Sequence, residues 1–186
     1  SEYRPEIEAD LIAAFLGRRV DGLLLIGARH ARGVRATLQR AGIPVVETWD
    51  LSPRPIDMLV GFSNRDAGRA AAAHLLDKGY RTLAFIGGDD DRSAARLEGF
   101  RSYARERGVA HVVAAQVPAP SSVLDGVAAC CDLLRSSRPP RAVFCSNDML
   151  AAGALFECQR RRIAVPGELA LMGFADLPIA AALEPA

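Results

Sequence analysis

Short apolar runs alternate with longer amphipathic stretches along this sequence, and this rhythm limits the possible folds most strongly. The apolar runs have the composition of buried strands, and the stretches between them fit helices that end at Gly or Pro. The expected strands are 20–26, 45–48, 58–62, 82–86, 112–117, 142–145 and 169–174. The expected helices are 5–18, 31–40, 64–78, 92–107, 121–135 and 148–161. Repeated strand–helix–strand units with right-handed crossovers predict an α/β fold with doubly wound parallel sheets.

One segment breaks the rhythm and predicts a domain boundary. Between residues 45 and 63, two strands follow each other without a helix and are joined through Ser52-Pro53-Arg54-Pro55. A missing crossover helix indicates a change of sheet or a crossing between domains near residue 64, so we expect one domain at 1–63 and a second at 64–186. About three strands fall in the first domain and four in the second.

Composition excludes several classes of protein. The net charge is +1 and the sequence shows no stripe of basic residues, which argues against this chain binding nucleic acid by itself. The longest apolar run is 23–26, so no membrane span is expected. The four cysteines lack metal-site spacing, and Cys145 and Cys158 are expected to be small buried residues in a reducing cytosol. We therefore predict a cytoplasmic location and no metal.

Catalytic patterns are absent from the sequence. The three histidines, His30, His74 and His111, are scattered, and no Ser-His-Asp order or pair of acids stands out. Gly87-Gly88 lacks the full dinucleotide fingerprint. We expect no enzyme activity and no cofactor.

Polar and aromatic residues at strand ends are the candidate ligand contacts, because a crevice forms where parallel strands end. Trp49 and Phe62 could stack on a sugar or pack in the core, and Ser63 could donate to a hydroxyl. Asn147 and Asp148 open a helix, where either can cap; we expect Asp148 to be the cap.

Arginines on the helix after strand 82–86 have two interpretations. Arg96 alone fits a solvated helix arginine. Arg92, one turn earlier, could face the same way or neutralise the acids at 89–91. Those acids could also simply favour the helix N-terminus.

Several motifs in order resemble one family of bacterial transcription factors, the lactose-repressor/galactose-repressor (LacI/GalR) family. The motifs are Gly61-Phe-Ser-Asn-Arg-Asp-Ala-Gly68, His74-Leu-Leu-Asp-Lys-Gly-Tyr-Arg81, Ala84-Phe-Ile-Gly-Gly88, Arg96-Leu-Glu-Gly-Phe100, Ser146-Asn-Asp148 with Ala152-Gly153, and Val165-Pro166 through Gly173-Phe-Ala-Asp176. Within the family, Pro44-Val-Val-Glu-Thr-Trp-Asp50, Pro55-Ile-Asp-Met58 and Phe156-Glu-Cys-Gln159 look most like the gluconate-utilisation repressors.

The resemblance implies a two-lobed, type I periplasmic-binding-protein-like effector core with its N-terminal lobe truncated. Family members carry a helix-turn-helix, which this chain lacks, and they bind operator DNA as dimers. The chain also lacks the first strand, helix and second strand of the N-terminal lobe and stops before the family's last helices. The implied function is the effector-sensing core of a repressor of carbohydrate or gluconate genes, with a homodimer, operator DNA and a small sugar or aldonate as partners.

The resemblance also assigns roles to residues. Arg96 matches a family arginine whose guanidinium donates two hydrogen bonds to sugar hydroxyls or to a carboxylate. Asn147 matches a family asparagine that contacts the ligand. Many members place an acid where this chain has Ala175, which puts Asp176 in doubt as a contact and suits an anionic effector. The expected ligand contacts are Trp49, Phe62, Ser63, Arg92, Arg96, Asn147 and Asp176.

Two other functions stay open at this point. A periplasmic sugar-binding protein would share the fold, and a signal peptide upstream would favour it. A doubly wound enzyme would need a nucleophile or cofactor motif.

Overall fold

A computed structural model describes residues 5–185, and these form two compact units that divide between Ser63 and Asn64. The units are described separately below as unit 1 (up to Ser63) and unit 2 (from Asn64 on). All the described strands pair in parallel within their sheets, which confirms the predicted α/β class. Unit 1 has three strands and unit 2 has four.

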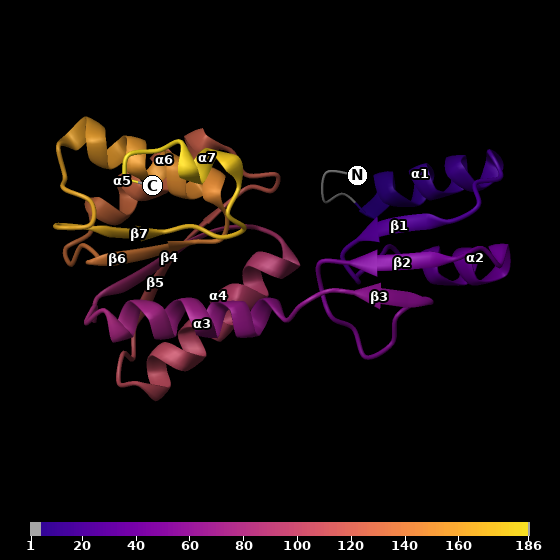
Figure 1. The fold of residues 1–186 in the computed structure, drawn as a ribbon, viewed down its shortest axis with the longest axis horizontal. Coiled ribbons are helices and arrows are strands. Elements are labelled where there is room, and N and C mark those ends of the chain that lie inside the picture. Colours follow the sequence, from indigo (N-terminus) through magenta and orange to yellow (C-terminus); the bar gives the residue numbers. More distant parts are fainter. Residues whose placement is uncertain (1–4, 186) are drawn as a thin grey trace. The chain divides into compact units, whose positions relative to one another are not determined.

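Unit 1 is a three-stranded sheet with helices packed on one face (Figure 1). Its elements are α1 (Pro5–Gly17), β1 (Leu23–Ile26), α2 (Val34–Ala41), β2 (Val45–Thr48) and β3 (Met58–Val60), with sheet order β1-β2-β3. The expected strand at 20–26 begins only at Leu23. Arg19 takes a left-handed φ of 55° and residues 21 and 22 are exposed, so the chain is still turning there.

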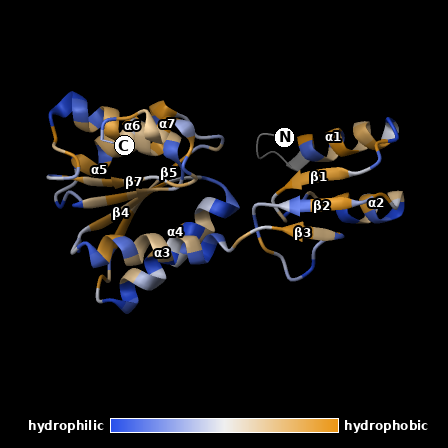
Figure 2. Ribbon diagram, viewed as in Figure 1, coloured by the Kyte–Doolittle hydropathy of each residue, from blue (hydrophilic) through white to orange (hydrophobic). Residues whose placement is uncertain are grey.

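The apolar side chains of unit 1 divide between a buried and an open face of the sheet. Leu25 and Val45 point into a cluster with Ile12 of α1 and Leu38 of α2. On the opposite face, Leu24, Ile26, Met58 and Val60 are exposed. Figure 2 shows β1 and β3 as hydrophobic strands, whereas β2 becomes hydrophilic toward its carboxyl end.

Unit 2 is a four-stranded sheet between two layers of helices (Figure 1). Its elements are α3 (Asn64–Asp77), β4 (Leu83–Gly88), α4 (Asp91–Glu106), β5 (Val112–Val117), α5 (Val123–Leu134), β6 (Ala142–Cys145), α6 (Asp148–Arg161), β7 (Ala170–Met172) and a short α7 (Pro178–Ala181). Helices α3 and α4 pack on one face around Phe85, Phe100 and Phe144. Helices α5 and α6 cover the other face.

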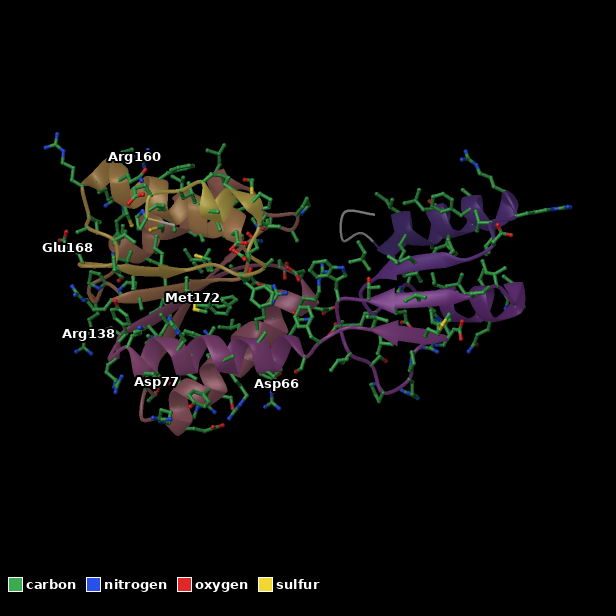
Figure 3. All side chains as sticks on the ribbon, in the orientation of Figure 1. Asp66, Asp77, Arg138, Arg160, Glu168 and Met172 are labelled. Atoms are coloured by element: carbon green, nitrogen blue, oxygen red, sulfur yellow. The ribbon has the colours of Figure 1, made fainter. Side chains whose placement is uncertain are left out.

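Side-chain directions in unit 2 follow these layers (Figure 3). Met172 on β7 points toward the α3–α4 layer and packs against its cluster, whereas Asp66 and Asp77 lie on the exposed side of α3.

Cys145 and Cys158 are fully buried in the α5–α6 layer, as predicted. Burial raises the pKa of the Cys145 thiol, so this sulfur is an uncharged packing group.

The strand order of unit 2 contains a reversal of the kind at which α/β sheets bind ligands. The order is β5-β4-β6-β7, so the chain moves from β4 to one side, then returns to the other side of β4 as β6. This reversal is a topological switch point, where loops leave the carboxyl ends of β4 and β6 in opposite directions. The loops concerned are 89–90 and 146–147.

Candidate functional site

Arg96 lies at the switch point of unit 2 and is buried there, with only 8% of its surface exposed. It projects from α4, and its Nη1 donates to the Ser146 carbonyl oxygen after β6 at 2.8 Å. The Ser146 N–H in turn donates to the Ile86 carbonyl oxygen of β4 at 2.8 Å. The guanidinium therefore ties α4 to the end of β6 and is not the solvated arginine that the residue pattern alone suggested.

An aromatic ring stacks on the same guanidinium. The Cζ atom of Arg96 is 3.9 Å from the centroid of the Phe174 ring, which follows β7. A guanidinium over a ring face is attracted by the ring's quadrupole, and the planar fork is held in one orientation. Sequence reasoning missed Phe174 as a site residue, although its Gly173-Phe174 motif was noted.

Close approaches of backbone and side chain fix α4 at this site. Asp90 caps α4, because its Oδ1 accepts from the N–H groups of Arg92 and Ser93 at 3.1 and 3.0 Å. A Cβ on Gly87 would lie 2.2 Å from Ser93 Oγ, so only glycine lets β4 approach α4 so closely. One of the acids at 89–91, Asp90, therefore caps the helix, which agrees with the interpretation that these acids favour the helix N-terminus.

Asn147, rather than Asp148, caps α6. Its Oδ1 accepts from the Leu150 N–H at 2.9 Å, and its Nδ2 donates to Ser121 Oγ at 2.9 Å. The expectation that Asp148 is the cap is therefore wrong. The Asp148 carboxylate turns instead to the segment after β7 and accepts from the Leu177 N–H at 2.7 Å.

Asp176 stands apart from this buried cluster. It is exposed, and both Ala175 and Asp176 take left-handed φ angles, 104° and 54°. Arg92 is half-buried in the first turn of α4. The structure thus brings Arg96, Asn147 and Phe174 to the ends of neighbouring strands β6 and β7 and leaves the Asp176 side chain at the surface.

Unit 1 carries the remaining predicted contacts, Trp49, Phe62 and Ser63. The Trp49 and Phe62 rings meet edge to face, with centroids 6.5 Å apart, and 48% and 38% of these residues is exposed. Trp49 has a φ of 69°, an unusual conformation for a bulky residue. A Cβ on Gly61 would lie 1.9 Å from the Asp50 carbonyl oxygen. The segment after β2 and the segment after β3 are therefore in direct backbone contact.

A pocket of about 160 Å³ lies beside α6 and β7, but it suits a sugar acid poorly. Its lining is mainly apolar, with Leu155, Leu171 and Leu183 among its walls. Among the described residues that line it, only Asp148 carries a charge, and its carboxylate would repel an anion. The polar cluster around Arg96 is the better candidate site.

Within residues 5–185, no group of His, Cys, Asp and Glu side chains could hold a metal ion. None of the helices in that range is long and apolar enough to cross a membrane.

Comparison with known proteins places this architecture in a family. A sequence model described as "Periplasmic binding protein-like domain" matches residues 72–186. The solved structure of the transcription regulator GntR from Chromobacterium violaceum is 37% identical, with a TM-score of 0.92 over 98% of this chain and 68% of that chain. A LacI family transcriptional regulator from Silicibacter pomeroyi is 35% identical, with a TM-score of 0.90 over 98% of this chain and 69% of its own. The chain belongs to the LacI family of transcriptional regulators.

The sequence relatives agree with this assignment. The HTH-type transcriptional regulator GntR of Pseudomonas aeruginosa is 41% identical over 178 residues, which is 95% of this chain and 52% of the relative. The chain therefore spans about half the length of that relative. The predicted family and the periplasmic-binding-protein-like fold are confirmed, and these relatives are regulators rather than enzymes.

Proposed function

We propose that this chain is the effector-sensing core of a cytoplasmic bacterial repressor, and that its effector is a small sugar acid such as gluconate. The observation that carries the proposal is the buried Arg96 guanidinium at the β4–β6 switch point, held by Ser146 and Phe174. A fixed planar fork of N–H donors matches a carboxylate, and burial strengthens the charged contact. The similarity to regulators named GntR supports the same effector class.

Neighbouring groups would complete the selection of the ligand. Asn147 and Ser121 already share a hydrogen bond, and both carry groups that can donate to and accept from hydroxyls. Ala175 leaves an apolar methyl where many family members have a carboxylate. Separately, the family resemblance supports Trp49, Phe62 and Ser63 of unit 1 as ligand contacts, and the first two form an aromatic pair there.

We propose further that the chain does no catalysis and binds DNA only through a helix-turn-helix outside these 186 residues. Its net charge of +1 supplies little attraction for phosphates. The relatives' description as HTH-type regulators supports a homodimer that reads a near-palindromic operator. The same relatives disfavour a periplasmic sugar-binding protein as the alternative.

A matched pair of substitutions at Ala175 tests the effector class by calorimetry. Ala175→Asp adds a carboxylate directly after Phe174, and Ala175→Asn adds a side chain of nearly the same shape without charge. Both place a larger side chain at the same φ of 104°, so backbone strain is matched. Gluconate should bind wild type more tightly than glucose does, and only Ala175→Asp should weaken gluconate selectively. Equal affinity for glucose and gluconate in wild type, or equal losses in the two variants, contradicts an anionic effector.

A further inference from the structure

Unit 1 contains a buried charged cluster that the proposed effector contacts do not use. The His30 ring lies between two carboxylates: its Nδ1 is 3.1 Å from Glu8 Oε2 of α1, and its Nε2 is 3.0 Å from Glu47 Oε1 of β2. The side chains of His30, Glu8 and Glu47 are 6%, 15% and 0% exposed. The cluster thus joins α1, the loop after β1, and β2.

Packing alone does not explain a carboxylate at this depth. Glu47 points to the same face of the sheet as Val45, which lies in the apolar cluster of unit 1. A buried carboxylate is costly unless hydrogen bonds and an opposite charge compensate it. Glu47 has both, because its Oε2 accepts from the Ile56 N–H at 2.5 Å and its Oε1 faces the His30 ring.

The two contacts of His30 depend on one proton. Ionised carboxylates accept hydrogen bonds and cannot donate, so both contacts are satisfied only when each ring nitrogen carries hydrogen. Two charged side chains on adjoining segments bind elsewhere: Arg35 of α2 donates to the carbonyl oxygens of Arg54 and Pro55, and Asp57 accepts from the Val45 N–H. Removing one proton would therefore leave a ring lone pair facing a carboxylate oxygen.

The cluster is tied to the strand end that carries Trp49. Glu47 lies on β2, two residues before Trp49, which directly follows the strand. Gly27 lies in the loop after β1 that carries His30, and its N–H donates to the Thr48 carbonyl oxygen at 2.8 Å. The Trp49 N–H donates to the Val60 carbonyl oxygen at 3.3 Å. Trp49 holds a φ of 69°, and a sparsely populated backbone conformation persists only where its surroundings fix it.

We propose that His30 is a positioning residue: clamped between Glu8 and Glu47, it fixes the carboxyl end of β2 and with it the orientation of Trp49. Held between the two carboxylates, His30 ties α1 to β2, and loss of either contact loosens the end of β2. The consequence for ligand binding rests on the proposed role of Trp49 as an effector contact. The effect on Trp49 itself needs no ligand.

Trp49 is the only tryptophan, so its fluorescence reports on this strand end directly. Emission and acrylamide quenching would be compared in wild type, His30→Gln, Glu8→Gln and the control His74→Gln, which changes an exposed histidine of α3. The two cluster variants should show red-shifted emission and stronger quenching, whereas the control should match wild type.

Circular dichroism checks that each variant is folded. Glu8→Gln keeps the test decisive if His30→Gln does not fold, because Glu8 is the most exposed member of the cluster. Unchanged emission and quenching in the folded cluster variants overturn the proposal.

A measurement of ligand binding separates this proposal from the proposed function. With gluconate as the probe, binding to Glu8→Gln should weaken by about threefold to tenfold, a loss of roughly 0.7–1.4 kcal/mol. If wild type does not bind gluconate, the proposed effector class fails, while the ligand-free emission of Trp49 still decides the role of His30. If gluconate binds equally to wild type and Glu8→Gln, the positioning of Trp49 does not serve this ligand and the consequence proposed for ligand binding is wrong.

Discussion

At the scale of single residues, the backbone after β7 carries strain beside the buried Arg96. Ala175 and Asp176 are consecutive non-glycine residues with φ of 104° and 54°. Such conformations cost on the order of 1–3 kcal/mol each and gather at functional sites, where the surrounding structure maintains them. Here the strained turn follows Phe174, whose ring lies on the guanidinium.

Replacing Ala175 by glycine should relieve part of this strain. Glycine adopts positive φ freely, but it also loses more backbone entropy on folding, so the net gain should be about 0.5–1 kcal/mol. The matched control is Ala182→Gly, because Ala182 has an ordinary φ of −92°. Urea unfolding should show Ala175→Gly more stable than wild type and Ala182→Gly no more stable. A destabilised Ala175→Gly would mean that the turn is not strained.

A surface pair gives a prediction about pH. Arg69 holds Glu106 through two hydrogen bonds of 2.8 Å, which lowers the pKa of the Glu106 carboxyl from 4.5 to about 2. A depressed carboxyl pKa contributes stability above the unfolded value, and this contribution disappears as the pH falls from about 4.5 to about 2.

The arginine is therefore expected to control the titration of Glu106. In Arg69→Ala, an NMR titration of the Glu106 carboxyl should show its pKa moving up toward 4.5, because the main cause of the depression is gone. Arg135→Ala, which removes an exposed arginine at the end of α5, should leave the Glu106 titration unchanged. An ordinary Glu106 pKa in wild type would contradict the observed pairing.

At the scale of elements, α5 and α6 pack closely enough for backbones to touch. A Cβ on Gly153 would lie 2.0 Å from the Val123 carbonyl oxygen, and one on Gly126 would lie 2.4 Å from the Leu150 carbonyl oxygen. Backbone atoms cannot rotate away as side chains do. The two glycines therefore set the distance between these helices and hence the position of Asn147 at the start of α6.

Gly153→Ala tests this close approach with two opposing terms. Alanine improves helix propensity by about 0.8–1.0 kcal/mol. Forcing an extra methyl into a filled interface costs about 1–3 kcal/mol, so we expect net destabilisation and a separation of α5 from α6. Gly167→Ala is the control, because its nearest neighbour would be Ala164 Cβ at an ordinary 3.5 Å. If chemical unfolding shows the same free energy of unfolding for Gly153→Ala and wild type, α5 and α6 do not pack backbone to backbone.

The sequence predicted the elements well and their side-chain contacts less well. Strands and helices are local patterns, so all seven strands and the three-plus-four division could be inferred from apolar runs and the helix-free segment 45–63. The roles of Asn147 and Asp148 were exchanged because Asp148 is drawn to the Leu177 N–H, 29 residues away. The His30 cluster escaped notice for the same reason, since its partners lie 22 and 17 residues away.

At the scale of the whole molecule, the open face of the unit 1 sheet predicts self-association. Leu24, Ile26, Met58 and Val60 are 68%, 61%, 46% and 69% exposed on that face. A contiguous apolar surface of this kind is typical of interaction sites. In analytical ultracentrifugation the chain should associate as its concentration rises, and Val60→Lys should shift it toward monomer. Leu124→Lys, at an exposed leucine of unit 2, should have no such effect; a wild type that stays monomeric contradicts the prediction.

The proposed function depends most directly on the buried Arg96, whose guanidinium is expected to bind the carboxylate of the effector. Calorimetry with gluconate should compare wild type, Arg96→Ala and the control Arg105→Ala, which removes an exposed arginine from the last turn of the same helix. A charged hydrogen bond contributes about 1.5–3 kcal/mol, so Arg96→Ala should weaken gluconate binding on the order of tenfold to a hundredfold. Arg105→Ala should bind as wild type does. If folded Arg96→Ala retains the wild-type affinity for gluconate, the switch-point arginine does not recognise the effector and the account of the site is wrong.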